Sequence, residues 1–218
     1  ISPSDRGVNP AIALINVVTG SALLALSENV RGWQKRDCYR QLNAYLYNAE
    51  CDRVCLLFGL RRTGKTTLLR QAVLDMTPED AARTAYIKAT KRDTIAGLNR
   101  DMEQLRSQGF HFVLLDEVTL MRDFIDSAAL LSDIYAAQGM KIVLSGTDSL
   151  GFWFALHQEL YDRAKMIHTT FIPYREHSRL LGIDQIDEYI RYGGTLRAGE
   201  LNFDDAEVNA EDASFRDD

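Results

Sequence analysis

Short apolar runs alternate along the chain with longer segments in which apolar residues recur every three or four positions. The apolar runs predict five buried strands, at residues 53–58, 84–89, 111–115, 141–144 and 166–171. The periodic segments predict helices, at residues 36–48, 65–76, 94–106, 124–137, 152–161, 174–181 and 184–192. Because helical segments separate the strands, we expect a parallel sheet with helices on both faces. The predicted fold class is α/β.

The segment before the first predicted strand has a different pattern. Its most apolar stretch, residues 11–26, is interrupted by polar residues and falls short of the roughly 18 uninterrupted apolar residues of a membrane span. No basic segment precedes it, as a signal peptide would require. We therefore expect a packed helical extension over residues 1–50 and a core domain over residues 51–194. Residues 195–218 form an acidic tail or the start of a further domain.

Composition narrows the classes of function. Of the 218 residues, 46% are hydrophobic and 26% are charged, which is typical of a globular protein. The formal net charge is −6, so nothing in the overall charge supports nucleic-acid binding. Three cysteines without a C-x-x-C pair and four scattered histidines predict neither a disulfide framework nor a metal cluster. Reduced thiols of this kind indicate a cytoplasmic protein.

The sharpest motif lies between the first predicted strand and the helix that follows it. Residues 59–66 read GLRRTGKT, which fits G-x-x-x-x-G-K-[ST] at every fixed position. The glycines let backbone N–H groups surround phosphate oxygens, and the helix N-terminus adds partial positive charge. We expect Lys65 to reach the β- and γ-phosphates and Thr66 to ligate Mg²⁺. The predicted nucleotide-binding residues here are Gly59, Leu60, Arg61, Arg62, Thr63, Gly64, Lys65, Thr66 and Thr67.

A pair of carboxylates, Asp116 and Glu117, follows the third predicted strand. The carboxyl ends of strands form the ligand edge of an open α/β sheet. There Asp116 is expected to hold Mg²⁺ through water, and Glu117 to polarise a water for attack on the γ-phosphate. The alternative is a carboxylate pair that caps the next loop. The phosphate-binding motif one βα unit upstream favours the catalytic interpretation.

Other polar residues are more ambiguous. Ser145 and Thr147 follow the next strand, where a hydroxyl could sense the γ-phosphate, but a helix N-cap explains them equally well. Arg163 and Arg175 are candidate cations for the transition state, and surface salt bridges are the alternative. Adenine recognition usually leaves no linear motif. ATP is therefore inferred from the carboxylate pair rather than from base-reading residues.

Taken together, these segments resemble a known family. GLRRTGKTTLLRQ, FVLLDEV, KIVLSGTDS, LYDRAKMI, FIPYREH and IDEYIRYGG are similar to the fourteenth family of AAA domains, a group of prokaryotic AAA-like P-loop ATPases. The resemblance spans about residues 52–194 and implies ATP and Mg²⁺ as ligands and a C-terminal domain after the ATPase core. It implies Asp116 and Glu117 as the Walker B pair and Arg163 as the family arginine, although Asp162 replaces the usual glycine before it.

The leading hypothesis is a P-loop ATPase of AAA or STAND-like type, with strand order 5-1-4-3-2, that hydrolyses ATP to ADP and phosphate with Mg²⁺. The alternative is a nucleotide-gated regulatory or interaction module with little turnover. A small-molecule kinase is disfavoured because no acceptor-binding lid is evident. The chain starts without Met and its last 24 residues cannot supply the C-terminal domain. We therefore expect an incomplete chain or a bare ATPase core, with a homo-oligomer or that domain as partner and no membrane association.

Overall fold

The computed structural model describes residues 16–121, 124, 130–146, 163–192 and 194–196. Within these ranges six strands form one sheet: β1 (Val17–Thr19), β2 (Val54–Phe58), β3 (Thr84–Lys88), β4 (Phe112–Asp116), β5 (Lys141–Gly146) and β6 (Ala164–His168). Their order is β1-β3-β4-β5-β2-β6, and all pairs except β1 and β3 are parallel. Read from β6, the five predicted strands follow the expected order 5-1-4-3-2. The α/β fold class is confirmed.

The helices alternate with the strands as the sequence pattern predicts. The α-helices are α1 (Gly20–Ser27), α2 (Tyr39–Leu46), α3 (Lys65–Asp75), α4 (Pro78–Ala82), α5 (Ile95–Ser107), α8 (Tyr174–Leu181) and α9 (Ile186–Tyr192). Shorter helical turns are η1 (Glu28–Val30), η2 (Val118–Leu120), η3 (Leu131–Tyr135) and η4 (Ala136–Gln138). The predicted helix at 152–161 and part of the one at 124–137 lie outside the described residues.

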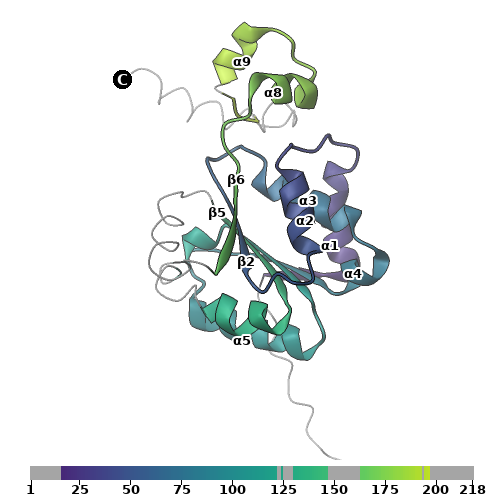
Figure 1. Ribbon diagram of the computed structural model, residues 1–218, viewed down its shortest axis with the longest axis vertical. Coiled ribbons are helices and arrows are strands. Elements are labelled where there is room, and N and C mark those ends of the chain that lie inside the picture. The colour runs from purple at the N-terminus through teal and green to yellow at the C-terminus, as the bar shows by residue number, and fades with distance from the viewer. Residues whose placement is uncertain (1–15, 122–123, 125–129, 147–162, 193, 197–218) are drawn as a thin grey trace, which may run out of the picture.

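Two hydrophobic layers enclose the sheet, one on each face. Helices α1 to α4 cover one face and α5 covers the other, while α8 and α9 lie beyond one end of the strands (Figure 1). Alternate strand residues supply the two layers: Leu56 packs with the α5 residues Leu98 and Met102, whereas Leu57 packs with Leu68 of α3. A strand that is apolar on both sides is typical of a parallel sheet covered by helices.

The strand register brings the carboxyl ends of the parallel strands to one edge. Phe58, the last residue of β2, pairs with Gly146 in β5 and with His168 in β6. Lys88 at the end of β3 pairs with Asp116 at the end of β4. Loops that follow these strands therefore converge at one edge, where α/β sheets bind their ligands.

The N-terminal extension is not purely helical. Val17–Thr19 forms an antiparallel edge strand on β3, with Val17 opposite Ile87 and Thr19 opposite Ala85. Three residues are too few to show the alternation that identifies a strand in a sequence. After β1, the side chains of Leu23 and Leu42 are buried in the layer that contains α3. The described part of the extension thus shares its core with the rest of the domain.

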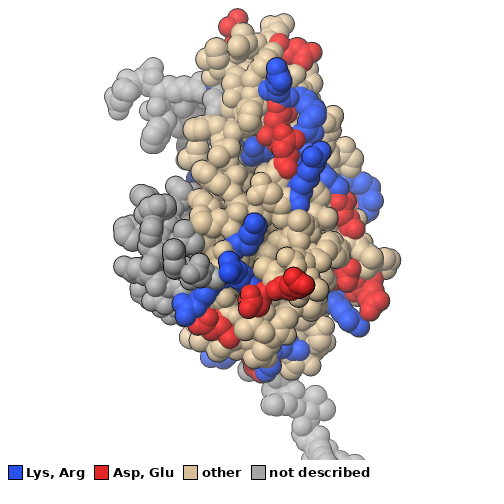
Figure 2. All heavy atoms as spheres, viewed as in Figure 1, with Lys and Arg blue, Asp and Glu red and all other residues tan. Residues whose placement is uncertain are grey.

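The described surface mixes charges of both signs. Figure 2 shows one face of the molecule, on which basic and acidic side chains lie beside one another. The basic side chains on this face do not form a continuous patch free of acidic ones. This agrees with the net charge of −6 in giving no support to a nucleic-acid interface on that face. Among the described helices, none has the length and apolar character needed to cross a bilayer.

Candidate nucleotide-binding site

The loop at residues 59–66, called the P-loop below, connects β2 directly to α3. Gly64 stands at the N-cap of α3 with φ +88°, in the left-handed region that glycine adopts without strain. Gly59 has a different reason to be glycine, because a Cβ there would lie 2.4 Å from the carbonyl oxygen of Thr169. Thr169 follows β6, and its N–H donates to the Phe58 carbonyl at 2.7 Å. The residue after β6 lies so close to Gly59 that no side chain fits at this position of the motif.

Hydrogen bonds fix the inner side of the P-loop. Thr63 is fully buried, and its hydroxyl donates to the Leu60 carbonyl at 2.8 Å. The hydroxyls of Thr63 and Thr169 also share a hydrogen bond of 2.8 Å. Arg61 and Arg62, in contrast, are exposed. The loop is thus anchored through Thr63 while its two arginines face outward.

The ammonium group of Lys65 is held at the start of α3. Its Nζ donates to the carbonyl oxygens of Gly59 at 2.9 Å and Leu60 at 2.5 Å, and the residue is 5% exposed. Burial lowers the pKa of Lys65 to about 8, against the opposing effect of the Glu117 and Asp116 charges. A phosphate ligand would compete with the two loop carbonyls for the N–H groups of this lysine.

Asp116 is the centre of a buried hydroxyl cluster at the end of β4. Its Oδ2 accepts hydrogen bonds from Thr66 at 2.7 Å and from Tyr86 at 2.8 Å, and its Oδ1 accepts one from Ser145 at 2.6 Å. Asp116 is 1% exposed. Carboxylate and hydroxyl oxygens are the ligand types that Mg²⁺ takes, so Thr66 and Asp116 fit the predicted metal.

Glu117 directly follows this cluster in an unusual backbone conformation. Its φ of 60° and ψ of 34° place a residue other than glycine in the left-handed region. Such conformations cluster at functional sites, where the surrounding structure enforces them. The Glu117 charge acts on Lys65 and raises its pKa, so the carboxylate belongs to the electrostatic environment of the P-loop.

A cavity of about 230 Å³ lies beside the first turns of α3. Its lining includes Gly64 at the N-cap of α3, Thr67 of α3 and Leu181 of α8. Gln71 also lines it, is 3% exposed, and donates through Nε2 to the carbonyls of Trp33 at 3.1 Å and Gln34 at 3.4 Å. The Oε1 atom of Gln71 has no hydrogen-bond partner among the described residues. A buried acceptor of this kind favours a ligand that donates an N–H group.

Comparison with known proteins identifies the architecture around this site. A family model described as an AAA domain matches residues 52–178, more than half of the chain. The chain belongs to the AAA domain family. No curated protein sequence matches it significantly.

Two solved structures match this chain over most of its length. The chain is similar to the Saccharomyces cerevisiae Hsp104:casein complex in its extended conformation, with 12% identity and a TM-score of 0.53 over 82% of this chain and 34% of that chain. The structure of Caenorhabditis elegans PCH-2 matches with 17% identity and a TM-score of 0.41, over 82% of this chain and 50% of that one. This chain thus spans half or less of the length of these two matched chains. The first likeness supports the P-loop NTPase fold.

Arg163 lies at the amino ends of β2 and β6, whereas the P-loop follows the carboxyl end of β2. It precedes β6, and its carbonyl accepts a hydrogen bond of 3.1 Å from the N–H of Val54, the first residue of β2. Five strand residues at about 3.3 Å each put roughly 16 Å between this position and the P-loop. Its Nε lies 2.8 Å from Oδ1 of Asp133, with both side chains partly exposed. The structure does not bring Arg163 into the site of its own subunit, and its contact with Asp133 is the salt bridge that the sequence analysis gave as the alternative.

Several contributors to the site were missed by the sequence analysis. By pattern, Tyr86 and Thr169 are ordinary residues of predicted strands, and Gln71 is one polar position in a predicted helix. Each acts through a partner that is distant in sequence, so no local spacing reveals it. Of the two sensor candidates, the structure joins Ser145 to Asp116, while Thr147 lies outside the described residues.

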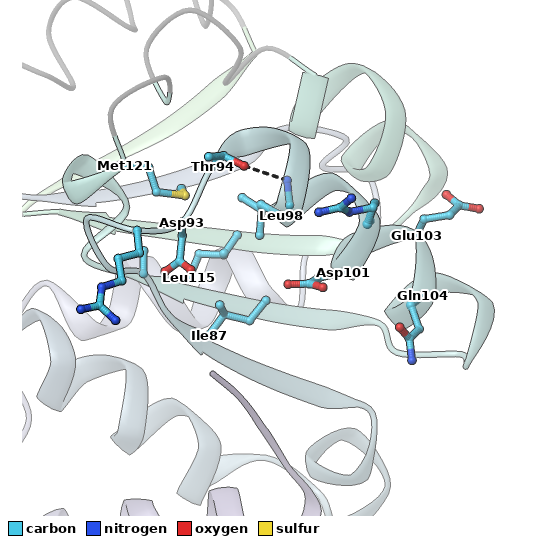
Figure 3. Close-up of a pocket in the computed structure, with 13 residues that line it drawn as sticks. Ile87, Asp93, Thr94, Leu98, Asp101, Glu103, Gln104, Leu115 and Met121 are labelled. Carbon is cyan, nitrogen blue, oxygen red and sulfur yellow. Dashed lines mark hydrogen bonds between the residues drawn. The ribbon is translucent and has the colours of Figure 1, made fainter. Parts of the chain in front are cut away.

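A second cavity, of about 630 Å³, lies on the other face of the sheet. Leu98 and Asp101 of α5 line it together with Ile87 of β3 and Leu115 of β4 (Figure 3). Its rim is polar, and Thr94 there caps α5 by accepting the Gly97 N–H at 3.2 Å. No residue of the P-loop lines this cavity. It is therefore separate from the nucleotide site.

Proposed function

We propose that this AAA domain binds ATP with Mg²⁺ and hydrolyses it to ADP and phosphate. The observation that carries the proposal is the 2.7 Å hydrogen bond between the Thr66 hydroxyl and Asp116. It joins the end of the P-loop to the carboxylate that ends β4, which are the two parts a phosphoryl-transfer site needs together. Membership of the AAA domain family supports nucleotide binding of the ATPase type.

Each residue of the site has a distinct role in this proposal. The P-loop amides and the Lys65 ammonium bind the phosphate oxygens, and Thr66 and Asp116 would hold Mg²⁺. When bound, the metal supplies positive charge that neutralises the triphosphate. Glu117 orients a water molecule and accepts its proton as the water oxygen bonds to the γ-phosphorus. The bond between that phosphorus and the β–γ bridging oxygen breaks, and ADP leaves with the electron pair.

The cavity beside α3 supports adenine as the base. It adjoins Gly64 and Thr67, so a nucleotide whose phosphates occupy the P-loop can reach it with its base. The unpartnered Oε1 of Gln71 matches the exocyclic amine of adenine, a donor, whereas guanine presents a carbonyl at the same position.

Base preference tests this assignment directly. The wild-type protein is expected to bind ATP about tenfold more tightly than GTP, since a mismatched acceptor leaves a buried group unpaired. Gln71→Met removes the acceptor and should bring the ratio of the two dissociation constants close to one. The ratio isolates base recognition, because any loosening of the Trp33 segment affects both nucleotides alike. A Gln71→Met protein that keeps the ATP preference would show that another group reads the base.

Steady-state phosphate release tests the hydrolytic step. Glu117→Gln is expected to lower turnover by about 10² to 10⁴, the usual contribution of a general base, while retaining ATP affinity. Glu103→Gln, on the exposed side of α5, is the matched control and should leave turnover unchanged. Wild-type turnover in Glu117→Gln would assign the base elsewhere. Near-zero turnover in the wild-type protein, with ATP-dependent assembly on size exclusion, would favour a nucleotide-gated module instead.

A further inference from the structure

A buried ion pair next to the P-loop connects the segment before α2 with α8. Arg36 lies between η1 and α2, and Glu176 lies in the first turn of α8. Their side chains are 6% and 5% exposed, and they pair through two parallel hydrogen bonds, Nε to Oε1 at 3.0 Å and Nη2 to Oε2 at 3.1 Å. The Asp37 N–H also donates to Oε1 at 2.7 Å. Both carboxylate oxygens of Glu176 are thereby occupied.

The remaining guanidinium nitrogen of Arg36 reaches the P-loop itself. Nη1 donates to the carbonyl oxygen of Thr63 at 2.9 Å and to that of Thr170 at 3.3 Å. Thr63 directly precedes Gly64, the residue that turns the loop into α3. One side chain therefore connects the P-loop, the segment after β6 and α8.

Other contacts between the same segments run parallel to this one. The N–H of Leu196 donates to the Arg62 carbonyl at 2.7 Å, and Thr169 packs against Gly59 on the opposite end of the loop. Leu181 of α8 lines the same cavity as Gly64. Residues that follow β6 thus contact the P-loop at Gly59 and at Arg62.

Burial makes this ion pair sensitive to separation of its partners. A bidentate guanidinium–carboxylate pair shielded from water is strong, and removing one partner leaves a buried charge without compensation. Burial alone would raise the pKa of Glu176, but the hydrogen bonds from Arg36 and Asp37 outweigh it and lower that pKa. Movement of α8 away from the core would break the pair and withdraw support from the Thr63 carbonyl.

We propose that Arg36 and Glu176 act as positioning residues that couple the placement of α8 to the conformation of the P-loop. With the pair closed, the Thr63 carbonyl is held and the loop keeps the shape that receives phosphate. With the pair open, α8 and the loop loosen together and nucleotide affinity falls. The link to nucleotide rests on the proposed function, whereas the coupling between α8 and the loop does not.

The test replaces the pair without leaving a buried charge. In Arg36→Met/Glu176→Leu, apolar side chains fill the same space, a change that is often neutral for stability. We expect the variant to stay folded, with a thermal midpoint lowered by several degrees at most, because the Thr63 and Thr170 carbonyls lose their donor. We also expect amide hydrogen exchange to rise about tenfold, together, in peptides covering the P-loop and α8, because a buried hydrogen bond to a charged group is lost. Exchange is measured on the full chain without nucleotide.

Two further proteins complete the design. Glu176→Gln keeps the shape of the side chain and removes its charge, and it serves if the double variant does not fold; the same joint rise in exchange is expected. The matched control is Arg83→Met/Glu79→Leu, which removes an exposed pair at the start of β3, at the opposite edge. It should leave exchange in both peptides unchanged. A folded pair variant with wild-type exchange in the P-loop overturns the coupling.

Nucleotide titrations then separate this inference from the proposed function. If the coupling acts on the nucleotide site, the dissociation constant for ATP rises about tenfold in the pair variants and not in the control. Joint loosening of the loop and α8 in a protein that binds no ATP would remove the proposed function and keep the coupling. Unchanged ATP affinity with a loosened loop would limit the pair to a role in loop order and overturn its role in affinity.

Discussion

Two buried lysines lie near opposite ends of the strands, and each donates hydrogen bonds to two backbone carbonyls. Lys65, at the ligand edge, is 5% exposed and donates to two carbonyls of the P-loop. Lys141, at the start of β5, is 4% exposed and donates to the carbonyls of Asn48 at 2.7 Å and Cys51 at 2.5 Å. The difference lies in what surrounds them.

Around Lys65 the polar groups are buried and connected to one another. Glu117 and Asp116 both raise the pKa of this lysine, and Asp116 collects three hydroxyl donors of its own. Lys141 instead binds the backbone of the loop between α2 and β2 and has a structural role there. A buried ammonium bound to carbonyls is thus common to both positions, whereas nearby carboxylates at the carboxyl ends of the strands distinguish Lys65.

The largest expected effect comes from removing each lysine in turn. Lys65→Ala should weaken ATP binding about a hundredfold or more, because charged hydrogen bonds to phosphate are lost. Lys141→Ala should leave ATP affinity within about twofold but lower the thermal midpoint by several degrees, since two buried carbonyls lose their donor. Calorimetric titration and thermal unfolding of both variants measure the two effects. Comparable losses of ATP affinity in both variants would contradict the assignment of phosphate binding to Lys65 rather than to Lys141.

The pH dependence of binding sharpens the same comparison. With a pKa of about 8, Lys65 is protonated in roughly nine-tenths of molecules at pH 7 and one-tenth at pH 9. The ammonium is the form that donates to phosphate, so the dissociation constant for ATP should rise about tenfold between these pH values. Lys65→Arg, whose guanidinium stays charged, should show a flat profile over this range whatever its absolute affinity. A flat wild-type profile would contradict the role given to this lysine.

A smaller effect is expected from the hydroxyl that supports Asp116. Tyr86→Phe removes one of three donors to a carboxylate that is 1% exposed, and should raise the Mg²⁺ concentration needed for half-maximal turnover by about three- to tenfold. Tyr45→Phe is the control, because the Tyr45 hydroxyl binds the Arg53 and Ile142 backbone at the other edge. It should alter stability and leave the Mg²⁺ dependence unchanged. Equal Mg²⁺ requirements in wild-type and Tyr86→Phe would show that Tyr86 does not orient Asp116.

The smallest effect is expected at Arg163. This partly exposed arginine pairs with Asp133, and exposed ion pairs contribute about 1 kcal/mol or less. Arg163→Ala should therefore change ATP affinity by less than about twofold and the thermal midpoint by a few degrees at most. Turnover measured over a range of protein concentrations tests whether Arg163 acts at the site of a neighbouring subunit. A loss of turnover only where subunits associate would place Arg163 at the site of a neighbouring subunit.

Local patterns were enough to predict most of the fold and the centre of the site. The P-loop and the pair Asp116 and Glu117 are contiguous motifs, and the alternation of strands with helices determines which edge carries them. The missed features depend on long-range contacts. Arg36 and Glu176 are 140 positions apart, and Tyr86 and Asp116 are 30 apart, so nothing in the sequence links them. β1 was missed because three residues carry no readable period.

In the proposed function, the P-loop receives the triphosphate of a nucleotide. Calorimetric titration of the whole chain with ATP and with AMP, each with Mg²⁺, tests it most directly, because AMP offers the same base and sugar without the β- and γ-phosphates. We expect saturable binding of ATP at one site per chain and an affinity for AMP that is weaker by about a hundredfold or more. Equal affinity for the two nucleotides, or no heat and no thermal stabilisation with ATP in a folded sample, would contradict it.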